Sequence, residues 1–224
     1  MSHSPSTAAV TLPTHDAPLK PDQEWANALT HGIATGVALV AGGYLIWAAT
    51  SNSGAITLAC AAYVASVVGT FFFSTLSHLI LRQPALDTLR AWDQAMIYLM
   101  ISGTYTPIVA AYAPDGVRGP LLVAIWVAAG GGFLNKIAIR HRINSVGTLS
   151  YLLLGWLPAL PLAGHVPAPL VSAMLAGGVI YSIGVAVLIN DHRLRYLHAV
   201  WHVTVLMAAA CHYLAILHYV VDAA

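Results

Sequence analysis

The last apolar segment of the chain reads LHAVWHVTVLMAAACHYLAILHYVV and runs from Leu197 to Val221. It contains no aspartate, glutamate, lysine or arginine. At 1.5 Å per residue, a helix of this length crosses the ~30 Å hydrocarbon core of a bilayer. The segment is therefore predicted to span a membrane. Its few ionisable side chains should face other helices, because their exposure to lipid costs free energy.

Two of these side chains open the segment as His198-Ala-Val-Trp-His202. Residues four apart lie on one face of a helix, roughly 6 Å apart along its axis, so both imidazoles can reach the same point. The spacing predicts two ligands of a metal site that needs a third. The alternative is that both histidines face lipid headgroups near a helix end.

The composition of the whole chain supports a membrane location. Of 224 residues, 58% are hydrophobic and 8% are charged, and the mean hydropathy is +0.75. These charges are too few to cover a globular surface in water, so the sequence predicts an all-α polytopic membrane protein. The net charge of +1 argues against nucleic acid as a partner. Cys60 and Cys211 lie in apolar segments and provide no disulfide framework.

Seven apolar stretches, each roughly 19 to 27 residues long, can cross a bilayer. They predict one domain, residues 24–224, folded as a seven-transmembrane-helix bundle. Residues 1–23 are polar and are expected to form a disordered tail and not a signal peptide. Pro107, Pro158 and Pro161 predict kinks. The stretches are residues 26–49, 55–81, 94–113, 119–139, 146–164, 168–189 and 197–221.

Lysine and arginine indicate the orientation, because short loops that carry them stay in the cytoplasm. Of the nine, all but Arg118 fall on the side of the N-terminus. We therefore expect a multi-pass protein of the cell (inner) membrane, with a cytoplasmic N-terminus and an extracytoplasmic C-terminus. The residues on the N-terminal side are Lys20, Arg82, Arg90, Lys136, Arg140, Arg142, Arg193 and Arg195.

This topology assigns a depth to the polar side chains of the spans. His78 ends the second span, Asp93 lies at the start of the third, and His198 and His202 begin the last. At 1.5 Å per residue, all four should lie within roughly 10 Å of the cytoplasmic boundary. Three neutral imidazoles with an open fourth position suit a catalytic zinc ion. A b-type haem held by two histidines is an alternative, but it leaves the third without a role.

Asp93 is expected to be the only carboxylate at that depth, placed to accept a proton from water at the zinc or to orient it. Alternatively, it is a solvated acid near the start of its helix, where a negative charge interacts favourably with the helix dipole. Ser74 can hydrogen-bond the water or a substrate carbonyl, or bond back to its own helix. His31 either supports the site or packs between helices. His212 lies too deep in the membrane to share the same metal.

Several short motifs occur along the chain: Glu24-x-x-Asn27-x-x-Thr30-His31-Gly32, Ser74-x-x-x-His78, Asp93 through Ile97-Tyr98, Gly103-Thr104-Tyr105-Thr106-Pro107, His198-x-x-x-His202 and Cys211-His212-Tyr213. Each is weak alone, but the set is specific and covers both ends of the chain. As a set they resemble the hemolysin III family, the bacterial branch of the progestin and adipoQ receptor superfamily.

The resemblance implies seven helices, a cytoplasmic N-terminus and a zinc ion held by His78, His198 and His202, with Asp93 and Ser74 nearby. Superfamily members include receptors with ceramidase-like activity. The resemblance therefore implies a zinc-dependent hydrolase of lipid amide or ester bonds, whose substrate enters laterally from the bilayer. The alternatives are a non-catalytic lipid sensor with a structural zinc and, less in keeping with this apolar chain, a cytolytic protein. The lipid substrate and the oligomeric state stay open.

Overall fold

The structure is a computed structural model that describes residues 20–139 and 145–222. Most of the predicted tail, residues 1–19, lies outside the described residues. Every regular element within them is helical, which confirms the predicted all-α class. The elements are α1 Pro21–Ala49, α2 Gly54–Leu79, α3 Ala85–Tyr112, α4 Asp115–Ile139, α5 Ser145–Trp156, the 3-10 helix η1 Leu157–Leu162, α6 Ala168–Ile189, α7 Leu197–Ile216 and the π-helical turn η2 Leu217–Val221.

Six of these helices are long and apolar enough to cross a membrane, so the chain is a multi-pass membrane protein. The predicted fifth span differs, because its α-helix ends at Trp156 and a 3-10 helix follows. Pro158 and Pro161 lie in that second part and have no backbone N–H to donate to an α-helical ladder. At Pro158 and Pro161 the structure therefore has a change of helix type, whereas Pro107 lies inside the α-helix α3.

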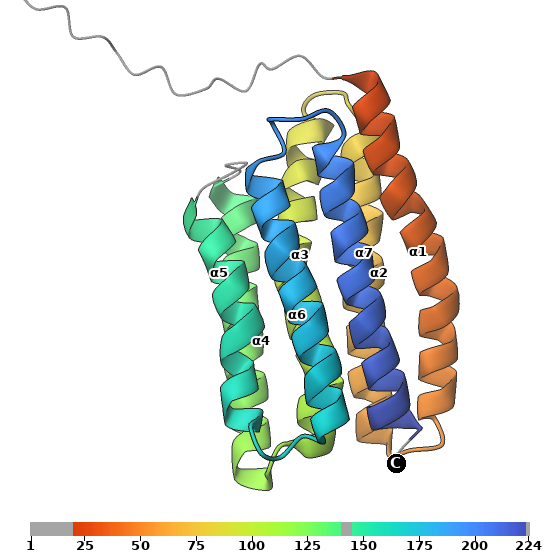
Figure 1. Cartoon of the computed structure of the whole chain (residues 1–224), viewed down its shortest axis with the longest axis vertical. Coiled ribbons are helices and arrows are strands. Elements are labelled where there is room, and N and C mark those ends of the chain that lie inside the picture. The colour runs from red at the N-terminus through yellow and green to blue at the C-terminus, as the bar shows by residue number, and fades with distance from the viewer. Residues whose placement is uncertain (1–19, 140–144, 223–224) are drawn as a thin grey trace, which may run out of the picture.

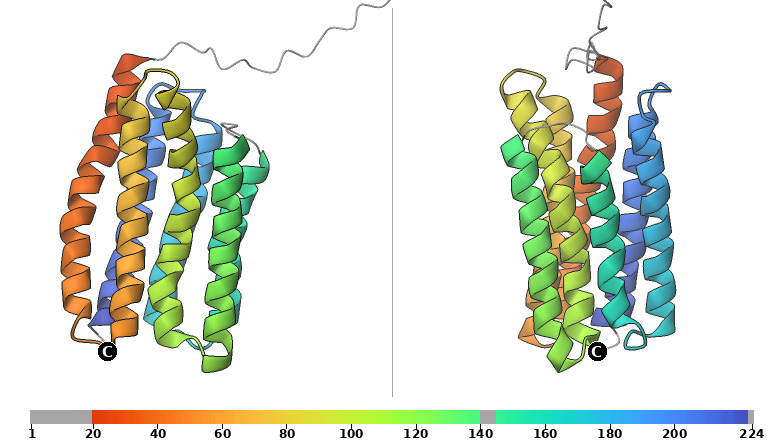
Figure 2. Two further views of the ribbon diagram at one scale, coloured as in Figure 1. Left: turned by 180° about the vertical axis from the view of Figure 1, so that it is seen from behind. Right: turned by 90° about the vertical axis from the view of Figure 1, so that its left-hand side faces the viewer.

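The helices stand side by side, and α3 is the most buried of the six long ones (Figure 1). It packs against α2 and α4, whereas α1 packs against α2 and α7, and α6 packs against α7. The beginnings of α1, α3 and α7 and the ends of α2 and α6 lie at one end of the bundle (Figures 1 and 2). Side chains far apart in the sequence are therefore neighbours at this end.

Several helices begin earlier than their apolar stretches, and for the first and the third the difference brings charged residues into the helix. The first includes Pro21 and Glu24, and the third begins at Ala85, so that both Arg90 and Asp93 lie inside a helix. Arg90 and Lys136, which the orientation argument counted as loop charges, are buried in α3 and α4. Both have partners there: Arg90 binds Glu24 and Lys136 donates to the side chain of Gln94. The cytoplasmic orientation of the N-terminus stays a prediction.

Candidate metal centre

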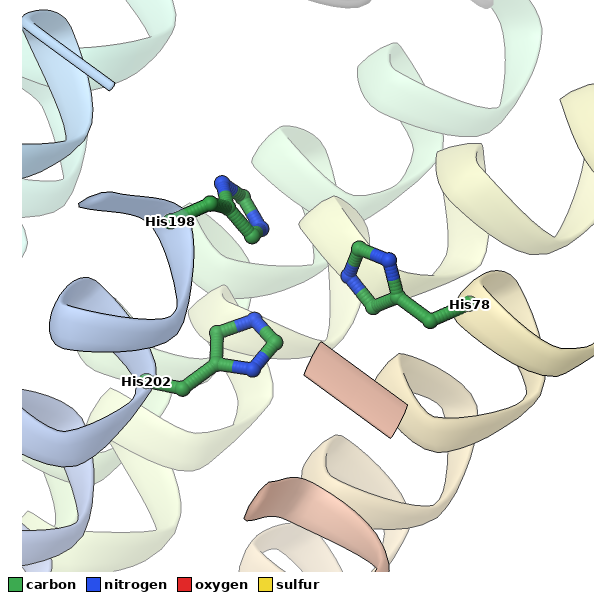
Figure 3. Close-up of side chains that lie close together, drawn as sticks. All are labelled: His78, His198 and His202. Carbon is green, nitrogen blue, oxygen red and sulfur yellow. The ribbon is translucent and has the colours of Figure 1, made fainter. Parts of the chain in front are cut away.

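Three histidines from two helices meet near one end of the bundle. His78 lies in the last turn of α2, and His198 and His202 lie in the first two turns of α7. One ligand nitrogen from each lies within 4.8 Å of those of the other two, so the group can hold a metal ion. Figure 3 shows the three rings turned toward a common space between the helices. The structure thus brings together the three histidines that the sequence singled out.

The three rings differ in exposure. His202 is 1% exposed and His78 is 6% exposed, so both are enclosed by neighbouring helices. His198 is partly exposed, because it lies one turn nearer the helix end. The ring centroids are 4.7 Å apart for His198 and His202, and each is 5.2 Å from that of His78. The group therefore has a closed inner side and a more open outer side.

The tautomer of His202 follows from its hydrogen-bond partners on α1. Its Nδ1 lies 3.2 Å from the carbonyl oxygen of Asn27 and 3.0 Å from Oγ1 of Thr30. The Thr30 hydroxyl already donates its single proton to the same carbonyl, at 2.8 Å. Both atoms must therefore accept from Nδ1. The proton of a neutral His202 sits on Nδ1, and its Nε2 keeps a lone pair for a metal.

Carboxylates fix the other two imidazoles in the same way. The Nδ1 of His78 donates to Glu24 at 2.6 Å, and the Nδ1 of His198 donates to Asp191 at 2.8 Å. The second carboxylate oxygen of Glu24 accepts from the buried Arg90 at 3.0 Å. A metal-binding histidine usually donates its other N–H to such an acceptor, which sets the tautomer and strengthens the ligand.

Two features of the three histidines fit a metal ion: the nitrogen that each ring leaves free, and the lack of a hydrogen-bond partner at one of these nitrogens. All three rings use Nδ1 for hydrogen bonds within the protein, so Nε2 is the nitrogen that would hold a metal. The Nε2 of His78 is buried and has no hydrogen-bond partner. A buried nitrogen of this kind costs free energy unless an ion or water satisfies it. Neutral imidazoles suit zinc and several other transition metals.

Neither Asp93 nor Ser74 forms a hydrogen bond with a ligand ring. Asp93 accepts from the hydroxyl of Ser77, the residue before His78, at 2.9 Å. The Ser74 hydroxyl is buried without a partner and so does not bond back to its own helix. The prediction that Asp93 is the sole acid at this depth is wrong, because Glu24 also lies there and binds His78 directly.

Glu24 and Asp191 are the site residues that sequence reasoning missed. Glu24 belonged to a recognised motif but preceded the predicted start of the first span. Asp191 lies in the connection between α6 and α7, seven residues before His198, where an acid is unremarkable. Counting acids as well as histidines near the predicted boundary would have found both. Only the packing of α1 against α2 shows which histidine Glu24 binds.

The remaining buried histidines have different surroundings. His31 stacks on His202 with ring centroids 3.7 Å apart and an interplanar angle of 8°. His212 lies further along α7, where its Nε2 is 3.3 Å from the carbonyl oxygen of Met174 on α6. It is not a member of the metal-binding group among the described residues. Its separation from that group is as the sequence predicted.

A small cavity lies beside His78 between the first turn of α1 and the end of α2, and it encloses about 90 Å³. This is enough space for water. It therefore gives water a way to the outer side of His78. The cavity is lined by Pro21, Glu24, Trp25, His78, Leu79 and Leu81.

Comparison with known proteins gives matches over most of the chain. Residues 19–213 match the family described as Haemolysin-III related. The protein "Hemolysin-3" of Bacillus cereus is 34% identical over 206 residues, which cover 90% of this chain and 94% of that protein. The "Hemolysin-3 homolog" of Bacillus subtilis (strain 168) is 32% identical over 203 residues, which cover 89% of this chain and 95% of that protein.

A more distant match extends to animals. The human "Monocyte to macrophage differentiation factor" is 30% identical over 127 residues, which cover 57% of this chain and 53% of that protein. No solved structure matches the chain.

Proposed function

We propose that this chain, which belongs to the Haemolysin-III related family, is a membrane-embedded hydrolase that uses zinc to cleave an amide or ester bond of a membrane lipid. Membership of the family confirms the resemblance seen in the sequence motifs. The observation that carries the proposal is the set of three imidazoles, each with Nδ1 bound to an acceptor and Nε2 left for a metal.

The choice of zinc rests on the ligand set. Three histidines with a fourth position left to water or substrate are the pattern of catalytic zinc sites, whereas structural sites are closed by four protein ligands. When bound, zinc supplies Lewis acidity, which activates water at neutral pH and polarises a carbonyl oxygen. Among the described residues, no fourth histidine, cysteine or carboxylate completes the group.

Other residues of the chain are proposed to orient the metal ligands, to transfer protons and to bind the substrate. Glu24, Asp191 and the Asn27 carbonyl hold the three rings and keep Nε2 unprotonated. Asp93, held by the hydroxyl of Ser77, is proposed to take the proton from the attacking water and return it to the leaving group. The buried, unpaired hydroxyl of Ser74 is proposed to donate a hydrogen bond to the substrate carbonyl.

The orientation proposal is that the centre lies near the cytoplasmic face of the inner membrane. Its support is the excess of lysine and arginine on the side of the N-terminus. Reporters with opposite compartment preferences, fused to the C-terminus, test this orientation. An extracytoplasmic signal is expected. A cytoplasmic signal would show that the bundle has the opposite orientation.

The catalytic proposal is tested by purifying the protein, measuring its metal content, and incubating it with a pool of N-acyl and ester lipids. Released fatty acid is the expected product. Asp93→Asn keeps the shape of the side chain and removes its basicity, so it should retain metal and lose about 10²- to 10⁴-fold in rate. Asp87→Asn, on the same helix but bonded to Gln83, is the matched control and should keep full activity.

A non-catalytic lipid sensor is the second candidate, and a specific observation favours it. The ligands come from both α2 and α7, so a bound metal ion would link the two helices. In that case zinc would hold these helices together and no fatty acid would be released by either the wild type or Asp93→Asn. A cytolytic role, which the names of the relatives suggest, would show as lysis of vesicles by the added protein.

A further inference from the structure

We propose that His31 is a positioning residue, which fixes the plane of the metal ligand His202 by stacking on its face. The proposal rests on the metal centre described above, and it assigns a role to a side chain outside the ligand set. Its starting point is the close, nearly parallel contact of the two imidazole rings, with centroids 3.7 Å apart and an angle of 8°.

The side chain of His31 is buried and makes no hydrogen bond. It is 4% exposed and lies on the buried side of α1, where the ring of Phe71 from α2 is its other aromatic neighbour, at 5.1 Å. Both of its ring nitrogens are buried and lack a hydrogen-bond partner. An imidazole in this state acts on its surroundings through its flat faces. The face that it presents to His202 is therefore its main contact with the centre.

The stack supplies what the hydrogen bonds to His202 leave undetermined. The Asn27 carbonyl and the Thr30 hydroxyl hold Nδ1, which fixes one edge of the ring. The ring is joined to the chain at Cγ, but small coupled changes of χ1 and χ2 can still tilt its plane while Nδ1 keeps its hydrogen bonds, and this carries Nε2 away from the metal. A parallel ring at stacking distance opposes this tilt. The hydrogen bonds at Nδ1 and the stacked ring of His31 together determine the direction in which Nε2 of His202 points.

The other two ligands are held differently. His78 and His198 each donate to a carboxylate, and their ring contacts are tilted contacts within the group. Among the described residues, His202 alone of the three pairs its hydrogen bonds with a parallel ring. It is also the most buried of the three. Loss of the stack should therefore weaken metal binding, because it removes a contact that orients the most buried ligand.

The experiment compares three variants of the full-length protein in detergent. His31→Phe keeps a flat ring and removes both nitrogens, His31→Leu fills the volume without a flat face, and His31→Ala leaves space. Zinc affinity is measured by competition with a chelating dye. Coordination geometry is measured from the visible spectrum of the cobalt(II)-loaded protein. His212→Phe, which changes another buried histidine in the same way, is the matched control.

We expect His31→Phe to bind zinc as the wild type does and to keep its cobalt spectrum. We expect His31→Leu and His31→Ala to bind zinc about 10- to 100-fold more weakly, the range typical for the loss of groups that orient a metal ligand. Because the phenyl ring removes two unpaired buried nitrogens, His31→Phe should also melt at a temperature no lower than that of the wild type.

Two results would overturn this proposal while leaving the metal centre in place. Wild-type affinity in both His31→Leu and His31→Ala would show that the stack does not matter. An equal loss of affinity in His31→Phe and His31→Ala, with a changed cobalt spectrum, would make the nitrogens responsible and His31 a ligand. If the wild-type protein itself binds no zinc, the proposed metal centre fails, and this inference fails with it. If only the lipid cleavage fails, the proposal stands.

Discussion

His202 and His212 lie on the same helix, and both are buried, with exposures of 1% and 7%. Their surroundings differ. His202 has two acceptors at Nδ1, a parallel ring on its face and two further imidazoles close by. His212 has a single carbonyl at 3.3 Å, an unpaired Nδ1 and the ring of Tyr181 at 5.6 Å.

The difference teaches that burial alone does not make a histidine a metal ligand. What distinguishes His202 is that polar groups from other helices converge on it. α1 supplies most of them, although it is less buried than α2, α3 or α7. Polar groups gather at this end of the bundle because helix ends and connections can carry them there without exposing them to lipid.

The largest expected effect comes from removing His202. His202→Ala should leave two ligands and lose stoichiometric zinc, and the rise in melting temperature that zinc gives the wild type should disappear with it. Metal analysis and thermal melts with and without a chelator measure both effects. His212→Ala should keep zinc, and the comparison breaks if it empties the site while His202→Ala does not.

A smaller effect is expected at the carboxylate that holds His78. Glu24→Gln keeps the shape of the side chain but weakens the acceptor at Nδ1, so zinc affinity should fall by about 10- to 100-fold. Asp22→Asn is the control, because Asp22 lies in the same helical turn but pairs with Arg195. Equal zinc affinities in the two variants would show that Glu24 does not support the centre.

Asp191→Asn should weaken zinc binding less, by roughly tenfold, the lower end of the range for such partners. The reason is exposure, because the Asp191 and His198 side chains are 23% and 29% exposed and water can replace part of the contact. Asp222→Asn removes a similar contact with His218 in η2, far from the centre, and should leave zinc affinity unchanged. A loss as large as that of Glu24→Gln would contradict this ranking.

The smallest effect on the metal is expected from a change beside His212. A Cβ at Gly177 would meet Nε2 of His212 at 2.3 Å, so Gly177→Ala should overpack α6 against α7. Such changes cost about 1–3 kcal/mol in stability, which a lower melting temperature in detergent would show. Zinc content should stay at the wild-type level, and a loss of zinc would mean that the two histidine environments are coupled.

The sequence by itself determined the class of protein and the composition of the candidate centre. In lipid, the backbone N–H and C=O groups of a long apolar stretch must find hydrogen-bond partners within the protein. A helix supplies these partners locally, so long apolar stretches predict membrane-spanning helices directly. The spacing of His198 and His202 places them on one face by local geometry alone. The alternating direction of the spans brings His78 to the same end, which requires only counting helices.

Only the tertiary structure decided how the histidines are held. Nothing local shows that Glu24 reaches His78, that Asp191 reaches His198, or that His31 stacks on His202. Each contact joins residues brought together by helix packing or by the path of a connection. The shortened fifth helix also needed the structure, because apolar length suggested a span while Pro158 and Pro161 ended the α-helix. Periodicity and hydropathy act within one segment, whereas ring orientation depends on neighbours that the fold supplies.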